Sequence, residues 1–327
     1  MSGRTGKKQP APGIVSVKLP PIGGANMVPF LQGPLTNRLS AISPKTEALV
    51  DPVTNEARLE NGALSIFLEN YDQLARPSRR GGRLAGYRTS THKLLDLVVT
   101  RFTSQVRYGK TGEMNTRVEI SLEEWISLLG KTSTPSTVKN VRRTVNEDLN
   151  ILYATSLEWR ENAPGGQGKN FKKTRLVSQI GIENSVIHVT LTHEIAEYLN
   201  TSFLMGYNLR LLGCPERNPS TYHCGKKLLL QYNAARRQAG EDPRFALISV
   251  KSLLEACPDI PTPDQVDDAH YQRRILQPLE GALDSLDFIE WDYSNPRGAP
   301  LTRSQVDRLD FHQVMELYVR FSLKEEA

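Results

Sequence analysis

The order of apolar and polar positions along this 327-residue sequence repeats once, about 130 residues apart. In each copy a short alternating stretch is followed by a brief helical pattern, a polar turn, a longer helical pattern and renewed alternation. Matching positions are Ile120 with Ile248, Arg142-Arg143 with Arg273-Arg274, Val145 with Leu276, and Leu152 with Leu283. Because solenoid repeats have much shorter periods, this spacing predicts two similar domains in series.

The longer helical pattern of the first copy has one apolar face. Its apolar residues recur at steps of three and four, which predicts a single buried stripe. The stripe consists of Val138, Val141, Val145, Leu149 and Leu152. The polar residues that fall mainly off it, and that we predict to be exposed, are Lys139, Asn140, Arg142, Arg143 and Asn146.

The second copy repeats this arrangement. Its predicted stripe consists of Ile275, Leu276, Leu279, Ala282, Leu283 and Leu286. The polar residues largely outside the stripe are His270, Gln272, Arg273, Arg274 and Gln277. Pro278 lies inside the pattern, and its missing N–H and bulky ring predict a kink or a restart of the helix there.

Alternation with a period of two follows each long helix and predicts a hairpin. In the first copy residues 155–161 lead through a glycine-rich turn to a return strand with Lys172, Lys173 and Arg175. In the second copy residues 288–293 lead to a turn with Asn295 and Arg297, and a last strand covers 317–323.

Strand, helix, turn, helix and hairpin is the order of a winged-helix domain. We therefore predict an α+β fold of two tandem winged-helix domains joined by a helix. The first domain is predicted over residues 89–212, and residues 213–327 hold the joining helix and the second domain. We predict that residues 1–88 form a largely disordered basic extension with a short helix near 62–74, because their first part is rich in Pro and Gly.

Charge is distributed unevenly along the chain. Residues 1–88 carry a net charge of +6, residues 89–200 carry +2 and residues 201–327 carry −3. Bulk charge therefore does not mark the C-terminal half as a nucleic-acid binder, and only local placement of cations favours that role. The arginines between Arg76 and Arg83 are either a solvated linker or a basic arm that lies along DNA.

Composition also indicates which classes of protein this is not. No apolar run approaches the roughly 18 residues that span a bilayer, and no apolar stretch follows the charged N-terminus, so we expect neither a membrane partner nor a secretory signal. Three scattered cysteines, Cys214, Cys224 and Cys257, are typical of a reducing cytoplasm, where we expect the protein.

The sequence offers no catalytic motif. His188 lacks the second histidine of a His-hydrophobic-His metal pair, and there is no glycine-rich loop with the spacing that binds nucleotide phosphates. Cys214, His223 and Cys224 do not have the spacing of a structural zinc site. We expect no enzyme activity, no cofactor and no metal.

DNA is the partner that the repeated pattern favours. The second helix of a winged-helix domain normally enters the major groove, and the hairpin contacts the backbone beside it. The candidate DNA-binding residues are therefore Lys139, Asn140, Arg142, Arg143, Lys172, Lys173, Arg175, His270, Gln272, Arg273, Arg274, Gln277, Asn295 and Arg297. Winged helices also serve as protein–protein modules, in which case the arginine pairs are only a solvated face.

Two segments resemble the theta-type plasmid replication initiators of the RepE, RepA and TrfA kind. Residues 273–293 (RRILQPLEGALDSLDFIEWDY) are similar to that family's basic pair, Leu-x-Pro and amphipathic run into a strand in the second domain. Residues 218–240 stand where the family has its joining helix. The likeness covers about 89–323, and it departs from the family in the long stretch after Pro296 and in the acidic segment 263–268.

The resemblance implies a function in plasmid replication. It implies binding to repeated double-stranded DNA sites at an origin, duplex opening, and recruitment of a host initiator and a replicative helicase. It also implies a homodimer in some members, which represses its own gene. A tandem winged-helix transcription regulator and a scaffold that binds no DNA remain alternatives. Direct repeats beside an AT-rich stretch would favour the initiator, and one inverted repeat at the promoter would favour the regulator.

Overall fold

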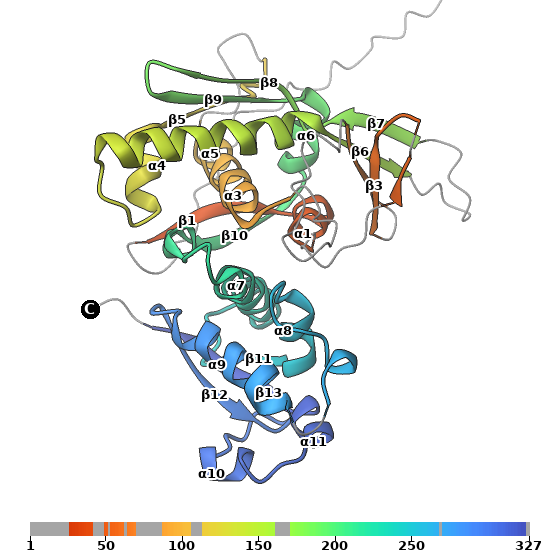
Figure 1. The fold of residues 1–327 in the computed structure, drawn as a ribbon, viewed down its shortest axis with the longest axis vertical. Coiled ribbons are helices and arrows are strands. Elements are labelled where there is room, and N and C mark those ends of the chain that lie inside the picture. Colours follow the sequence, from red (N-terminus) through yellow and green to blue (C-terminus); the bar gives the residue numbers. More distant parts are fainter. Residues whose placement is uncertain are drawn as a thin grey trace, which may run out of the picture.

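The computed structural model describes residues 26–41, 49–51, 53–61, 64–69, 87–105, 113–160, 171–267 and 270–324. Its upper part in Figure 1 contains the first repeat copy, which we call the first unit. The elements of this unit are α3 (Thr89–Ser104), β5 (Arg117–Ser121), α4 (Leu122–Leu128), α5 (Pro135–Ala154), β8 (Val177–Glu183) and β9 (Val186–Leu191). The three strands form an antiparallel sheet in the order β5-β9-β8.

Helix α5 forms where the apolar stripe predicts it. Thr134 is its N-cap and accepts a hydrogen bond from the Thr137 N–H, and Pro135 occupies the first turn, where a missing N–H costs nothing. Val141, Val145, Leu149 and Leu152 are buried, and Val138 is partly buried against the same core. The opposite face of the helix is left to solvent.

The second unit has the same order of elements. It consists of β11 (Ala246–Ser249), α8 (Val250–Ala256), the π-helical turn η3 (Gln272–Leu276), α9 (Gln277–Asp284), β12 (Ile289–Ser294) and β13 (Tyr318–Leu323). Its sheet has the order β11-β13-β12. The short helices η2 (Pro263–Gln265), α10 (Arg303–Val306) and α11 (Phe311–Met315) lie in its connections.

Helix α7 (Pro219–Ala239) joins the two units, as the sequence predicts. Asn218 is its N-cap residue, and Gly240 ends it with a φ of 76°, the left-handed conformation that glycine adopts readily. It follows α6 (His193–Asn200), β10 (Phe203–Asn208) and the 3-10 turn η1 (Leu209–Gly213). In Figure 1 it lies between the upper and lower parts of the molecule.

The predicted N-terminal extension contains regular structure in its described segments. Strand β1 (Met27–Gln32) pairs with β10, and α1 (Pro34–Ala41) follows it. Strands β2 (Leu49–Val50), β3 (Ala57–Asn61) and β4 (Leu64–Leu68) join β6 (Thr155–Arg160) and β7 (Phe171–Arg175) in a sheet of order β2-β3-β4-β6-β7. The predicted helix near 62–74 is therefore wrong, because Leu64–Leu68 is a strand paired with β6. The basic stretch 76–83 lies outside the described residues.

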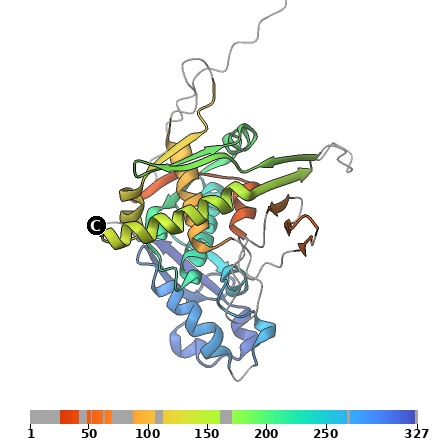
Figure 2. The ribbon, with the colours of Figure 1, turned by 45° about the horizontal axis from the view of Figure 1, so that its top comes forward.

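The predicted hairpin of the first unit is also corrected. Strands β6 and β7 do pair with each other, but they belong to the five-stranded sheet and not to the sheet that contains β5. The hairpin beside β5 is β8–β9. Figures 1 and 2 both show β6 and β7 lying past the C-terminal end of α5. The β6–β7 hairpin instead pairs with β4, which lies far away in the sequence. Ile66 of β4 and Leu157 of β6 are paired with each other, and both are buried.

The chain thus has the predicted α+β fold with two tandem winged-helix domains joined by a helix. Each unit places a three-stranded sheet against a helix pair, with the second helix of the pair presenting one exposed face. Within the described residues, no helix is both long and apolar enough to cross a membrane.

Candidate nucleic-acid interface

The outer face of α5 presents three cations of the first unit. Lys139, Arg142 and Arg143 are exposed, and with Asn146 and Ile182 of β8 they line an open groove of about 460 Å³. No described residue forms a hydrogen bond or an ion pair with the side chains of these three cations. Their charges are therefore available to an external anion.

The groove continues around the N-terminal end of the same helix. A second open hollow, of about 610 Å³, is lined by Ser133, Thr134, Pro135, Val138, Lys139 and Arg142. In a winged-helix domain the residues at this end of the second helix are those that reach base edges. Cations and small hydroxyl side chains thus occur together at the end of α5 where DNA contact is expected.

The β8–β9 hairpin is the wing beside this groove, and sequence reasoning missed it. Its two-residue turn consists of Asn184 and Ser185, both with positive φ (48° and 62°), which is the type I′ geometry that suits a tight hairpin. Alternation on both sides of Asn184-Ser185 is the signal that could have located it. The only ionisable residues in its two strands are Glu183 and His188, so the wing itself contributes no permanent cation.

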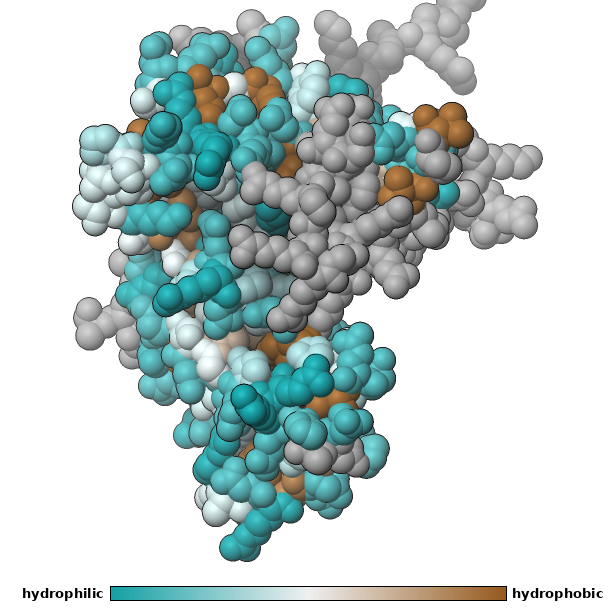
Figure 3. Space-filling view, in the orientation of Figure 1, coloured by the Kyte–Doolittle hydropathy of each residue, from teal (hydrophilic) through white to brown (hydrophobic). Residues whose placement is uncertain are grey.

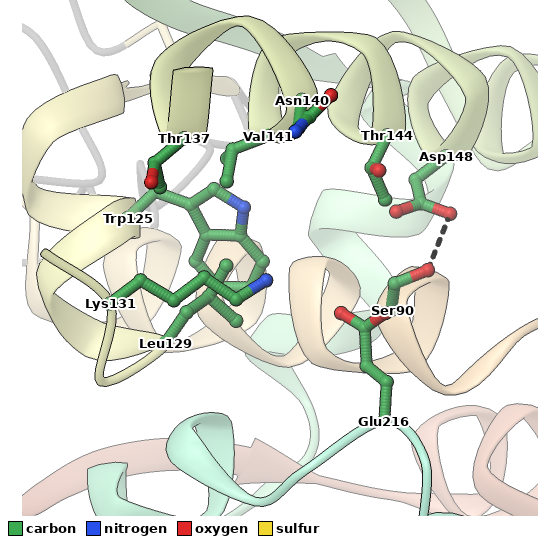
Figure 4. A pocket seen from close by; sticks show the side chains of 10 residues that line it. All are labelled: Ser90, Trp125, Leu129, Lys131, Thr137, Asn140, Val141, Thr144, Asp148 and Glu216. Carbon is green, nitrogen blue, oxygen red and sulfur yellow. Dashed lines mark hydrogen bonds between the residues drawn. The ribbon is translucent and has the colours of Figure 1, made fainter. Parts of the chain in front are cut away.

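Asn140 lies at the flank of the exposed face of α5, about one helical turn before Arg143. It also lines a cavity of about 240 Å³ between α3, α4 and α5, shown in Figure 4 together with Trp125, Lys131, Asp148 and Glu216. Asn140 therefore borders this cavity as well as the exposed helix face.

A buried carboxylate at the edge of this cavity holds α5 to the start of α3. Asp148 is 1% exposed, and its Oδ1 accepts hydrogen bonds from Arg88 (2.9 Å), Ser90 (2.9 Å) and Thr91 (2.7 Å). Burial raises the pKa of Asp148 to about 6, against the opposing effect of the Arg88 guanidinium and the two hydroxyl groups. We interpret this cluster as the support that fixes the exposed helix face.

Lys172, Lys173 and Arg175 do not lie beside that face. They belong to β7 in the five-stranded sheet, and the side chain of Lys172 lies outside the described residues. The Lys173 Nζ is 3.2 Å from Glu56 Oε1, and Arg175 Nη2 is 2.6 Å from Glu69 Oε2. These two cations are already paired within the protein, which makes them weaker candidates for phosphate contact than the cations of α5.

The corresponding face of the second unit is built on η3 and α9. Its predicted residues, which are all exposed, are His270, Gln272, Arg273, Arg274 and Gln277. Neither the Arg273 nor the Arg274 side chain has a hydrogen-bond or ion-pair partner among the described residues. The predicted kink at Pro278 appears as the π-helical turn η3, after which α9 begins regularly at Gln277.

Asn295 and Arg297 lie in a turn away from this helix face. The Asn295 Oδ1 accepts hydrogen bonds from the N–H groups of Arg297 (2.9 Å) and Ala299 (3.1 Å), so this amide oxygen serves the turn itself. A Cβ on Gly298 would lie 3.1 Å from the Phe245 ring and 3.4 Å from Leu247. Since Phe245 and Leu247 alternate with the buried Ala246 and Ile248, the turn covers the outer side of the sheet.

The surface around both helices is predominantly polar. In the view of Figure 3, hydrophilic residues cover most of the described surface of both units, and hydrophobic residues appear only in scattered spots. Among the described residues the exposed large hydrophobic side chains are Val53, Tyr153 and Phe203. A surface with free cations and without a contiguous apolar patch favours a polyanion over an apolar protein partner.

No family model and no curated protein matches this chain. Among solved structures, domains 2 and 3 of RctB align with 89% of this chain and 99% of their own length, at 10% identity and a TM-score of 0.44. A second structure of RctB domains 2–3 covers 85% of this chain and 95% of its own, at 10% identity and a TM-score of 0.36. The WH1 domain of MSBI1.176, a replication protein isolated from a multiple sclerosis patient, covers 39% and 85%, at 13% identity and a TM-score of 0.26. At these scores the likenesses place the chain in no family.

The described residues contain no group of three or more His, Cys, Asp or Glu side chains that could hold a metal ion. Cys224 and Cys257 are both fully buried, with 2.9 Å between their sulfur atoms, and Cys214 is buried elsewhere.

Proposed function

We propose that this protein is a sequence-specific double-stranded DNA-binding initiator of plasmid replication. It binds repeated sites at an origin, promotes opening of the duplex there and represses its own gene. The observation that supports this most is the recurrence of exposed, unpartnered cations on the second helix of both units: Lys139, Arg142 and Arg143, and Arg273 and Arg274.

These side chains have a physical reason to bind DNA. An exposed cation without an internal partner loses little when it meets a phosphate, and each phosphate contact releases condensed counterions. Arginine also forms bidentate hydrogen bonds to guanine in the major groove, where a helix such as α5 fits. Two such helices in one chain allow the protein to read a longer site than one winged helix can.

Duplex opening follows from the addition of many contacts. Deforming a site costs several kcal/mol, which serial binding to repeats supplies beside AT-rich DNA. We propose that the protein performs no catalysis and uses no cofactor. Host initiator and replicative helicase then act on the opened strand. In this proposal the protein works in the cytoplasm, and a homodimer is the form that represses its gene.

The first test is binding to the DNA that flanks the gene. Arg142→Ala with Arg143→Ala should lower specific affinity by roughly one and a half to four orders of magnitude, since each of the two lost base contacts costs about 1–3 kcal/mol. The matched control is Arg117→Ala, which removes an exposed arginine that is paired with Glu119 on β5. Equal affinities of the double variant and the control for this DNA would refute the assignment of α5.

The second test separates the initiator from a transcription regulator of the same fold. A plasmid that carries only this gene and its flanking DNA should persist in a host where it otherwise cannot replicate. Maintenance should disappear with Arg142→Ala/Arg143→Ala and survive Arg117→Ala. Failure of the wild-type protein to maintain the plasmid, together with repression of a nearby promoter, would favour the regulator.

A further inference from the structure

The second helix of the first unit is α5, and that of the second unit consists of η3 and α9. Near their N-terminal ends these two helices bury residues at positions that do not match in the repeat alignment. Downstream, the repeat alignment holds: buried Val145, Asp148 and Leu152 of α5 correspond to buried Leu276, Leu279 and Leu283. Upstream, the alignment of Arg142-Arg143 with Arg273-Arg274 would match buried Val141 with exposed Gln272. The two helices therefore differ in register by one residue before this point.

The π-helical turn η3 accounts for the difference. Within it the Gln277 N–H donates to the Gln272 carbonyl, five residues back, whereas upstream the Arg274 N–H donates to the His270 carbonyl in the usual α-helical way. Pro278 has no N–H to offer the Arg274 carbonyl, and its ring would collide with that carbonyl in a regular helix. A widened turn relieves the collision and inserts one residue, which rotates the preceding segment by about 100° relative to α9.

Burial confirms this one-residue insertion. Tyr271 is 8% exposed and takes the place that Val141, 4% exposed, has in α5. Its hydroxyl donates to the Leu309 carbonyl at 2.9 Å, and its ring packs against Phe311. Ile275 and Leu276 are both buried where α5 has only Val145.

From this register we infer that Gln272 and Arg273, and not the pair Arg273 and Arg274, are the specificity-determining residues of the second unit. This inference rests on the proposed function, because it names which side chains of the DNA-binding face read bases. Counted from Tyr271, Gln272 and Arg273 occupy the places that Arg142 and Arg143 occupy after Val141. Arg274 is an additional exposed cation on the widened turn.

The shift changes the base that the second unit selects. Arginine pairs with the O6 and N7 of guanine, whereas glutamine pairs with the N6 and N7 of adenine. The first unit therefore presents two guanine-type side chains, and the second presents one adenine-type and one guanine-type side chain. Arg274, set aside from this pair, contacts phosphate and adds affinity without sequence preference.

The experiment measures binding of the full-length protein to a library of origin-site duplexes in which each base pair is varied. Gln272→Ala should reduce the preference for adenine at one position by roughly 5- to 150-fold, and Gln272→Arg should convert that preference to guanine. Arg274→Ala should weaken binding to all duplexes by the same factor and lower the slope of log affinity against log salt by about one.

Two outcomes would overturn the inference, and a third would overturn the proposed function instead. Loss of preference at a single base pair with Arg274→Ala contradicts the register, and so does an unchanged base preference with Gln272→Ala. A wild-type protein with no base preference anywhere would refute sequence-specific binding itself. Circular dichroism and a thermal unfolding curve for each variant establish that these exposed substitutions leave the fold intact.

Discussion

At the scale of single residues, two buried titratable groups act on stability in opposite directions. Burial raises the pKa of Asp148 to about 6 from 3.8, so between these values the folded state holds a proton that the unfolded chain has released. Stability from this group therefore falls as the pH rises from 3.8 to 6. Burial, with the charges of Lys226 and Lys93, lowers the pKa of His223 to about 3 from 6.5. The unfolded chain takes up this proton first, so stability from His223 falls as the pH drops below 6.5.

Asp148→Asn and His223→Phe should consequently change the slope of unfolding free energy against pH in opposite directions. Relative to the wild-type protein, His223→Phe should gain up to about 1.4 kcal/mol of unfolding free energy for each pH unit below 6.5. Asp148→Asn should lose a similar amount for each unit below 6, although its amide oxygen still accepts from Ser90 and Thr91. Urea unfolding between about pH 4.5 and 6 measures both slopes. A pH-independent offset for either variant would contradict the corresponding shift.

At the scale of elements, α7 is packed tightly against both units. On the side of the first unit, Lys226 forms an ion pair with the buried Asp96, which also accepts a hydrogen bond from the Tyr222 hydroxyl at 2.6 Å. At Gly225 the helix passes between Leu211 of η1 and Leu286 after α9, where an added Cβ would lie 2.4 Å and 2.8 Å from their methyl carbons. A side chain at this position would push against both units at once.

Gly225→Ala should therefore be destabilising compared with a matched glycine in an open helix. Gly281 of α9 is exposed, and a Cβ there meets nothing within 4 Å. Both substitutions gain about 1 kcal/mol of helix propensity, so the difference between them isolates the crowding at Gly225, which we expect to cost about 1–3 kcal/mol. Urea unfolding of the two variants gives this difference. Equal unfolding free energies would show that Leu211 and Leu286 move aside freely.

Elements whose partners are local could be predicted from the sequence, and elements whose partners are distant could not. The apolar residues of α5 recur with the period of a helix, and Pro278 predicts the irregular turn before α9. Strand β4 pairs with β6, about 90 residues away, and β1 pairs with β10, about 175 residues away, so nothing beside them in the sequence marks them. The sequences of two neighbouring hairpins, β6–β7 and β8–β9, show the alternation of apolar and polar residues equally well. Only the pairing of β9 with β5 identifies β8–β9 as the wing.

The candidate site was predictable to a similar extent. The stripe correctly leaves Arg142, Arg143 and Arg273 exposed, because a helix period fixes which residues face the core. It does not show that Lys173 and Arg175 are neutralised by Glu56 and Glu69, which come from the N-terminal segments. The one-residue shift before Leu276 also escapes a repeat alignment, since a π-helical turn changes phase without changing the sequence spacing.

At the scale of the whole molecule, the packing of α7 fixes how far apart the two exposed helix faces lie. Buried ion pairing on one side and close packing at Gly225 on both sides leave little freedom between the units. In the proposed function, two DNA-binding faces held in this way act as one bivalent binder, because contact by the first face makes contact by the second nearly intramolecular. The gain in affinity exists only for DNA in which the spacing of the two half-sites matches the fixed distance between the two helix faces.

A duplex with both half-sites at the natural spacing should accordingly bind about 10²–10⁴-fold tighter than a duplex with either half alone. Inserting about five base pairs between the half-sites should remove this gain by turning the second half-site to the opposite side of the helix. Inserting about ten should remove it too, because the facing is restored but the distance grows by about 34 Å, which a rigid α7 cannot span. Titration of the three duplexes with wild-type protein and with Arg142→Ala/Arg143→Ala, which should show little gain at any spacing, measures the effect. A gain that survives the ten-base-pair insertion would mean that the two units move independently, and the packing of α7 would then not set the length of the site.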